Sequence, residues 1–309
     1  MILILSLLLP VALIGVVVAN HDDDDDDSGE SLEGAENADT LEGGQGDDFL
    51  DGGAGDDDLV GLAGDDTIFG REGDDIITGE DGADMLCSGD GDDFITGNRG
   101  SDTIEGQGGD DFISGDYSAD LLRGNEGSDT LVGGRGFDNL GGFSGDDVLF
   151  GGIVNALPLD LEEMDALRDG TSTLADLNGG QVDMRDDSLG NILYGGAGDD
   201  DLILGSQDMG TGGNGEDTFH VLNEQAGAGV ATIMDYDEVD DSVTVIVEND
   251  TDVNVTVNNN DGDAIVRVDG TVVARVTGAG GTLSAGDITV LTEATVVQLF
   301  EPNAPAAVA

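Results

Sequence analysis

The chain has 309 residues, of which 69 are Asp or Glu and 8 are Arg, and its formal net charge is -61 at pH 7. This charge excludes nucleic acid as a partner and opposes direct adsorption to an anionic membrane surface. Cys87 is the single cysteine, so no disulfide framework can stabilise an extracellular form of the chain. Such an acidic excess instead suits the binding of cations.

Residues 1–19 form a hydrophobic segment in which residues 2–19 carry no charged side chain. Two interpretations remain open: a signal peptide cleaved after small residues near Ala19, and a membrane anchor just long enough to span a bilayer. Either one exports the remainder of the chain, and the acidic linker of residues 20–33 belongs outside the membrane. The sequence therefore predicts a secreted or extracellular protein, or one anchored to the outside of a membrane through residues 2–19.

A nine-residue unit then repeats thirteen times in one register over residues 34–150. A typical copy, residues 43–51, reads Gly-Gly-Gln-Gly-Asp-Asp-Phe-Leu-Asp. The first position is Gly in twelve copies and the fourth in eleven, while the sixth is always Asp and the eighth always Leu or Ile. A disordered acidic tract has no reason to keep this register, so the pattern indicates a repeat architecture.

Positions one to six of each unit are expected to form a turn, since glycine allows positive φ and close approach of neighbouring backbones. Positions seven to nine are expected to form a short strand with the eighth side chain inward. Two units make one coil of eighteen residues, so the aspartates fall into two columns on opposite edges. One column contains Asp39, Asp57, Asp75, Asp93, Asp111, Asp129 and Asp147; the other contains Asp48, Asp66, Asp84, Asp102, Asp120 and Asp138.

These columns destabilise the fold unless their charge is neutralised. Two carboxylates ~5 Å apart repel by roughly 3 kcal/mol at an effective dielectric near 20. A hard divalent cation between successive turns removes the repulsion, and Ca²⁺ suits a site of six to eight oxygens better than Mg²⁺ does. The columns therefore predict several bound Ca²⁺ ions, whereas a β-solenoid without metal leaves them unexplained.

The unit resembles the RTX (repeats-in-toxin), or hemolysin-type, calcium-binding nonapeptide, which forms a Ca²⁺-binding parallel β-helix. The resemblance resumes at residues 195–202 and 212–219. It implies an all-β fold, a right-handed parallel β-roll (β-solenoid) with a β-rich cap. It also implies that sixth-position carboxylates bind the ions, together with Asp199 or Asp200 and with Asp217. Turn carbonyls are expected to supply the remaining ligands, among them those of Gly43, Gly46, Gly52, Gly55, Gly61, Gly64, Gly70 and Gly73.

Residues 151–189 interrupt the repeats. Within this insertion, residues 160–168 predict a short helix, because Asp160 and Glu163 have capping-box spacing. The insertion is expected either to pack on the roll or to bind a partner. The roll ends over residues 190–220, where Asn191 occupies an Asp position.

Residues 221–296 replace the glycine spacing with alternating strands. Residues 265–276 predict a hairpin with a primed turn at Asp269-Gly270. An open roll needs a cap over its last coil, and this region is similar to the cap that comes after the repeats in RTX proteins. Phe219, at the last inward position, is expected to bridge roll and cap. The tail of residues 297–309 is compatible with the C-terminal secretion signal of that family.

The sequence predicts a protein that is not an enzyme. It has two His residues and neither a His-Glu-x-x-His nor a Gly-x-Ser-x-Gly motif. A pore-forming toxin needs long apolar segments beyond residues 1–19, and an ice-binding solenoid needs a flat Thr array, which the outward seventh positions do not form. The expected function is that of a calcium-binding extracellular or cell-surface β-roll that folds after export. A secreted RTX-type toxin or adhesin is the alternative, and a protein or glycan partner is not identified.

Overall fold

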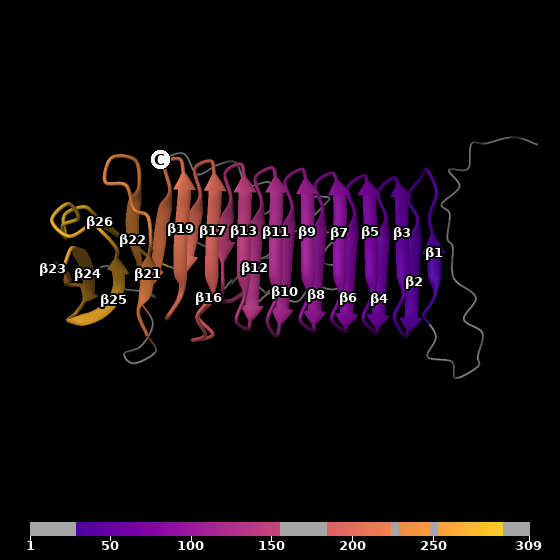
Figure 1. The fold of residues 1–309 in the computed structure, drawn as a ribbon, viewed down its shortest axis with the longest axis horizontal. Coiled ribbons are helices and arrows are strands. Elements are labelled where there is room, and N and C mark those ends of the chain that lie inside the picture. The colour runs from indigo at the N-terminus through magenta and orange to yellow at the C-terminus, as the bar shows by residue number, and fades with distance from the viewer. Residues whose placement is uncertain (1–28, 155–183, 224–228, 248–252, 293–309) are drawn as a thin grey trace, which may run out of the picture.

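The computed structural model describes residues 29–154, 184–223, 229–247 and 253–292. In these ranges the chain winds into a parallel roll of two facing sheets that ends in antiparallel hairpins (Figure 1). The predicted all-β, parallel roll is confirmed, and the described residues contain no helix. The helix expected at residues 160–168 lies outside them.

The odd-numbered strands of the roll form a sheet of thirteen strands together with the hairpins. In spatial order they are β1 (Ser31–Glu33), β3 (Phe49–Ala54), β5 (Thr67–Glu72), β7 (Met85–Asp90), β9 (Thr103–Gly108), β11 (Leu121–Glu126), β13 (Asn139–Ser144), β17 (Ile192–Ala197), β19 (Met209–Asn214), β21 (Ala231–Ile233), β25 (Thr271–Val276), β24 (Asp263–Val268) and β23 (Val255–Asn260).

The facing sheet has eleven strands. They are β2 (Thr40–Gln45), β4 (Asp58–Ala63), β6 (Ile76–Asp81), β8 (Phe94–Arg99), β10 (Phe112–Tyr117), β12 (Thr130–Arg135), β14 (Val148–Phe150), β18 (Asp201–Leu204), β20 (Thr218–Leu222), β22 (Ser242–Val247) and β26 (Ile288–Thr292). A separate antiparallel pair, β15 (Ile153–Val154) and β16 (Met184–Arg185), flanks residues 155–183.

Up to residue 150 each coil contains eighteen residues, as predicted, because Leu50 pairs with Ile68 and Ile68 pairs with Leu86. The strands, however, are longer than the expected triplet. They run through the second and third positions of the next unit, where Gly53 and Ala54 continue the pairing with the neighbouring coil. The turn is therefore confined to positions four to six, since main-chain pairing continues wherever stacked coils remain in register.

The glycines divide into two classes. Fourth-position glycines such as Gly64 have positive φ (143°), as expected. First-position glycines such as Gly43 do not, and positive φ falls instead on the second position, where Leu62 (80°) and Arg71 (99°) also adopt it. The first position requires glycine for space alone: a Cβ on Gly43 would lie 2.4 Å from the Oδ2 of Asp48.

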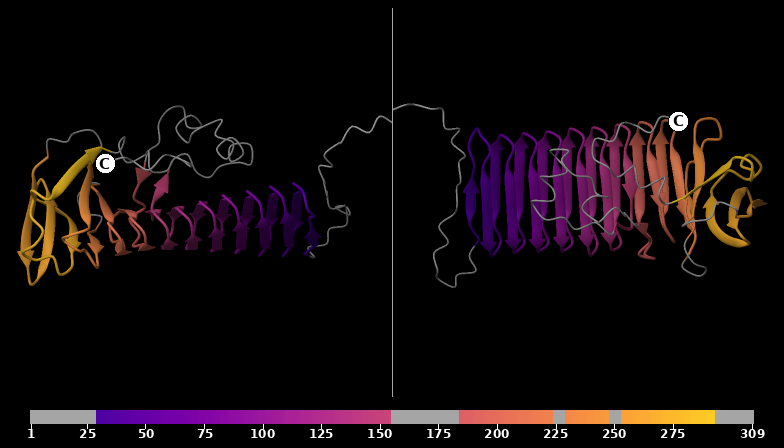
Figure 2. Two further views of the ribbon diagram at one scale, coloured as in Figure 1. Left: turned by 90° about the horizontal axis from the view of Figure 1, so that it is seen from above. Right: turned by 180° about the vertical axis from the view of Figure 1, so that it is seen from behind.

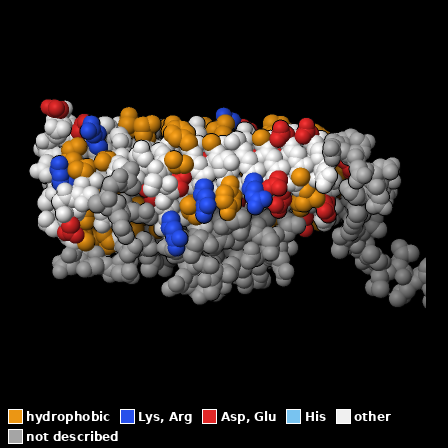
Figure 3. Space-filling model, turned by 90° about the horizontal axis from the view of Figure 1, so that it is seen from below, with side chains coloured by type: hydrophobic (Ala, Val, Ile, Leu, Met, Phe, Trp, Pro, Cys, Tyr) orange, Lys and Arg blue, Asp and Glu red, His pale blue; other side chains and the backbone are white. Residues whose placement is uncertain are grey.

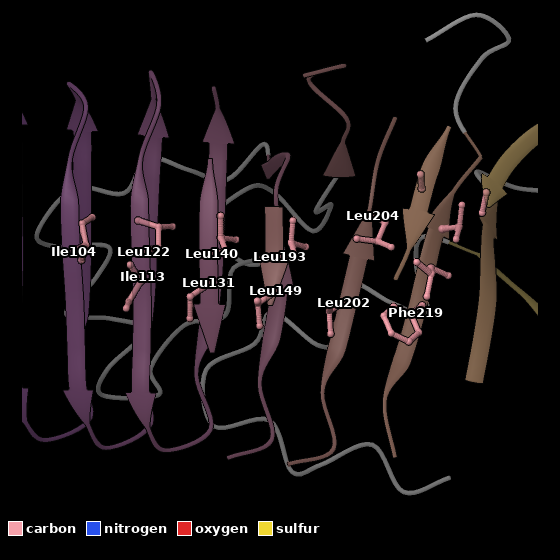
Figure 4. Close-up of a cluster of buried hydrophobic side chains, with 14 of the residues drawn as sticks. Ile104, Ile113, Leu122, Leu131, Leu140, Leu149, Leu193, Leu202, Leu204 and Phe219 are labelled. Atoms are coloured by element: carbon pink, nitrogen blue, oxygen red, sulfur yellow. The ribbon is translucent and has the colours of Figure 1, made fainter. Parts of the chain in front are cut away.

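The core is a double ladder of eighth-position side chains between the two sheets (Figure 4). From Leu41 to Leu149 these Leu and Ile residues are 0–1% exposed. Each contributes about 2 kcal/mol by leaving water. The ladder continues through Leu193, Leu202 and Phe219 into the hairpins, so roll and hairpins share one core.

The outer surface of the roll carries paired charges. Arg71 bonds Asp51 in a neighbouring coil at 2.7 Å and lies over the ring of Phe69, and Arg123 pairs with Glu105. Figure 3 shows Arg side chains interspersed with acidic and hydrophobic side chains along one face. Exposed pairs of this kind each contribute little, about 0–1 kcal/mol.

Both sheets continue beyond the last coil of the roll, one through β25, β24 and β23 and the other through β22 and β26 (Figure 2). β22 pairs in parallel with β20, which places Val243 beside Phe219, and β25 pairs with β21. The predicted hairpin is confirmed: β24 and β25 are antiparallel, and Asp269 (φ 50°) and Gly270 (φ 87°) form the turn. Phe219 is 0% exposed at the inward position expected for it.

A Gly64→Ala substitution is expected to destabilise the roll strongly. The new Cβ would lie 2.0 Å from the carbonyl oxygen of Gly46 in the preceding coil, in addition to requiring positive φ. The control is Gly270→Ala, which also has positive φ but meets no atom within 4 Å and so incurs only a strain of about 1–3 kcal/mol. Urea unfolding in saturating calcium measures both. Equal losses would show that stacked coils do not need this close approach.

Candidate metal centres

The sixth-position aspartates form two columns along opposite edges of the roll, as predicted. In the column that starts at Asp48, the main-chain N–H of Asp48 donates to the Oδ1 of Asp66 at 2.7 Å. In the column that starts at Asp39, the N–H of Asp57 donates in the same way to Asp75 at 2.7 Å. One carboxylate oxygen of each aspartate thus links its coil to the preceding one.

The second carboxylate oxygen is buried and accepts no hydrogen bond from the described part of the chain. This holds for the Oδ2 atoms of thirteen aspartates. They are Asp48, Asp57, Asp66, Asp75, Asp84, Asp93, Asp102, Asp111, Asp120, Asp129, Asp138, Asp147 and Asp200. Buried polar atoms in native proteins nearly always have a partner, so a repeated series of unpaired carboxylate oxygens indicates a ligand.

A main-chain carbonyl oxygen lies beside most of these carboxylate oxygens. The point where a Cβ of Gly43 would stand is 2.4 Å from the Oδ2 of Asp48 and 2.8 Å from the carbonyl oxygen of Gly61 in the next coil. The same arrangement recurs at Gly52 and Gly70. Two acceptor oxygens that face one small space without a donor repel each other. A hard cation between them removes the repulsion, because such cations prefer oxygen ligands.

The carboxylates resist ionisation in this environment. Burial and, to a smaller extent, the charges of neighbouring column aspartates raise the pKa of Asp75 to about 8 and that of Asp111 to about 9. The pKa of Asp57, which lies nearer the end of its column, is raised to about 6 by burial and by neighbouring aspartates. The chain therefore holds these groups where either a proton or a cation must compensate their charge.

The predicted glycine carbonyls lie at the turns beside the columns. Those of the first position, at Gly61 and Gly70, face the carboxylates of the preceding coil, while those of the fourth position, at Gly46 and Gly55, point at the fourth-position glycines of the next coil. Ser88 is the exception among the first positions, and its hydroxyl donates to the carbonyl of Gly106 at 2.8 Å.

Three predicted side chains differ in environment. Asp200 rather than Asp199 occupies the column, because the N–H of Asp147 donates to its Oδ1 at 2.9 Å, whereas Asp199 is exposed. Asp39, at the start of its column, accepts an N–H from Ala35 with its Oδ2 at 2.6 Å. Asp217 is buried, and its N–H donates to Asp241 at 3.1 Å.

The sequence did not predict the residues that close the columns. Asp208 accepts the N–H groups of Asn191 (2.8 Å) and Gly205 (2.7 Å). Asp241 likewise accepts those of Asp217 (3.1 Å) and Asp237 (2.7 Å). Asp208 was missed because its unit has Gly210 at the inward position. A signal was present, since Asp208 lies eight residues after Asp200 and nine before Asp217.

The fifth-position acids, such as Asp74, are exposed. They nevertheless link coils, since the Oδ1 of Asp74 accepts the N–H of Asp92 at 3.0 Å. Cys87, at a ninth position, lies between Phe69 and Glu105 of neighbouring strands and is 9% exposed. Burial raises the pKa of its thiol, which opposes reactivity.

Replacing a sixth-position acid is expected to cost far more than replacing its fifth-position neighbour. Asp75→Ala removes an unpaired buried oxygen together with the acceptor for Asp57, whereas Asp74→Ala removes an exposed acceptor worth about 1 kcal/mol. We expect Asp75→Ala to raise the calcium concentration needed for folding at least several-fold and Asp74→Ala to change it little. Calcium titrations followed by circular dichroism test this, and equal shifts would contradict the assignment.

Among the described residues, no group of three or more His, Cys, Asp or Glu side chains converges in metal-binding geometry. Nor do these residues include a helix able to cross a membrane. The proposed signal or anchor segment, residues 1–19, lies outside the described ranges.

Comparison with known proteins identifies the repeats. The family model for the RTX calcium-binding nonapeptide repeat matches residues 24–59, 33–68, 52–86, 60–95, 88–122, 123–155 and 190–208. Curated proteins gave no match. Among solved structures, the extracellular lipase LipA from Serratia marcescens is 14% identical with a TM-score of 0.23, and the alignment covers 80% of this chain and 40% of that one.

Proposed function

Because this chain is a member of the RTX calcium-binding repeat proteins, we propose that it is a non-catalytic extracellular or cell-surface protein whose roll folds on binding Ca²⁺ after export. The binding of calcium follows from the family. The location, the lack of catalysis and the coupling of folding to calcium are the proposal, and one observation carries it: thirteen buried carboxylate oxygens stand unpaired among the described residues.

The proposed ligands are the thirteen unpaired Oδ2 atoms and the first-position carbonyls beside them, with fourth-position carbonyls completing the oxygen set. Bound calcium supplies the positive charge that this arrangement needs. The Oδ1 atoms keep their bonds to the preceding coil, so they orient each carboxylate toward the centre. These residues come together only when the coils stack, and binding energy is therefore folding energy.

The chemistry of the described residues supports a role without catalysis. His220 is 5% exposed, and its ring nitrogens lie 2.6 Å from the Thr244 hydroxyl and 2.8 Å from Asp201. This is the environment of a buried histidine with satisfied partners rather than of a base that reaches a substrate. Export is supported by the hydrophobic residues 2–19, which suit a signal peptide or an anchor.

A calcium titration of the full chain tests the proposal. We expect a transition from a disordered to a β-rich far-UV circular dichroism spectrum, with a midpoint in the range of roughly 10⁻⁴–10⁻³ M that is typical of extracellular calcium modules. Magnesium at equal concentration is the control and should not replace calcium, because it demands a tight octahedron. A β-rich spectrum that chelation leaves unchanged at pH 7.5 would refute the coupling of folding to calcium.

A further inference from the structure

The two edges of the roll differ at the coil that comes after the insertion. On the edge of the Asp48 column, Asn191 takes the aspartate's place: its Oδ1 accepts the N–H of Asp138 at 2.8 Å, and its own N–H donates to Asp208 at 2.8 Å. On the opposite edge, the column continues with Asp200, whose Oδ2 is unpaired. Asn191 thus reproduces the structural half of an aspartate's role.

The second polar atom of the Asn191 side chain, the amide nitrogen, is a hydrogen-bond donor where an aspartate has an acceptor. The Nδ2 of Asn191 is 2.6 Å from the point where a Cβ of Gly151 would stand, which matches the 2.4 Å of the Asp48 Oδ2 at Gly43. From there the amide donates to the carbonyl oxygen of Gly151 at 3.0 Å. An amide nitrogen carries protons and no free lone pair, so it cannot bind a cation. At this coil, an amide N–H group takes the place of the unpaired carboxylate oxygen and donates to the Gly151 carbonyl, which also lies beside the Oδ2 of Asp138 in the preceding coil.

The next position on the same edge is also saturated. Both oxygens of Asp208 accept main-chain N–H groups, from Asn191 and from Gly205. No unpaired carboxylate oxygen therefore comes after Asp138 on this edge in the described part of the chain.

We propose that Asn191 ends the row of calcium centres on the Asp48 edge, because its amide nitrogen stands where a carboxylate ligand would be, whereas the row on the Asp39 edge runs at least one coil further, to Asp200. This rests on the proposed ligand set. Residues 190–208 match the repeat model in sequence, yet neither Asn191 nor Asp208 offers an unpaired carboxylate oxygen to a cation. The coil that carries the insertion is then joined on one edge without metal.

The test is a count of bound ions. The full-length chain and its variants are saturated with Ca²⁺, folded monomer is separated by size exclusion, and bound calcium is measured by equilibrium dialysis with atomic emission. We expect Asn191→Asp to bind one ion more than the wild type, because it restores the second carboxylate oxygen beside Gly151. The matched control, Asp138→Asn, makes the opposite exchange one coil earlier and should bind one ion fewer.

Asn191→Ala keeps the proposal falsifiable if the new carboxylate prevents folding. It removes the amide without adding a ligand, so its ion count should equal that of the wild type, although its urea midpoint falls. A lost ion in Asn191→Ala, or an unchanged count in folded Asn191→Asp, would overturn the inference. A wild-type chain that binds no calcium would instead refute the proposed function itself, and the two failures are therefore distinct.

Discussion

Stripped of calcium, the chain is expected to be largely unfolded at pH 9 and to gain β-structure as the pH falls toward 5. The cause is the set of column carboxylates whose pKa values burial raises. The pKa rises to about 6 at Asp93 and Asp102, to about 7 at Asp84 and Asp129, and to about 9 at Asp147. A proton on each carboxyl removes the charge that the metal-free roll cannot accommodate.

The direction follows from linkage. The folded pKa values lie above the ordinary value of 3.8, so the folded chain binds more protons than the unfolded chain between pH 3.8 and about 9. The stability contributed by these groups is full below pH 3.8 and is lost as the pH rises through about 6 to 9. Most proteins lose stability on acidification because their carboxylates are paired, and the metal-free roll should show the reverse.

Far-UV circular dichroism and hydrodynamic radius of resin-stripped protein between pH 5 and 9 measure this effect. The calcium-loaded chain is the control and should respond in the opposite direction, because protons compete with the cation for the same oxygens. A metal-free chain whose β-structure falls on acidification would show that the column carboxylates are satisfied in some other way.

The nine-residue repeat predicts most of the fold. A fixed nine-residue period, with an aliphatic residue at one position and Asp at another, determines coil length, inward ladder and edge columns together. Leu50, Ile68 and Leu86 are therefore stacked in the predicted register. Strand length was underestimated, because glycine at positions one and two reads as a turn although the backbone there still pairs with the next coil. The sequence shows residue types, and only stacking shows which main-chain groups pair.

The site was predictable in outline and less so in detail. The sequence predicts that the carboxylates form columns, but it does not show that their two oxygens differ. One oxygen accepts a main-chain N–H of the preceding coil, and the other is unpaired. It also missed Asp208 and Asp241, since neither belongs to a complete unit. Asn191 stood out as a departure, but its hydrogen bond to Gly151 joins residues 40 apart in sequence and depends on where the chain returns after the insertion.

Truncation after Asp217 is expected to raise the calcium concentration needed for folding several-fold or more, although most metal centres lie far from the cut. The shortened chain loses Phe219 and the core side chains beyond it, which cover Leu202 and Leu204. It also loses the carboxylates of Asp235 and Asp241, which accept main-chain N–H groups of the last coil.

A one-dimensional stack gains stability from its neighbours, so an uncovered terminal coil frays first and lowers the cooperativity of the rest. Calcium titrations of the full chain and of the truncated form, followed by circular dichroism, measure the shift. The control removes only residues 293–309, which come after the last described strand, β26, and it should leave the midpoint unchanged. Coincident midpoints for the full chain and the form ending at Asp217 would mean that the hairpins fold as an independent unit and do not cap the roll. A shift confined to the larger truncation would show that β20 to β26 stabilise coils that they do not touch, through the shared core.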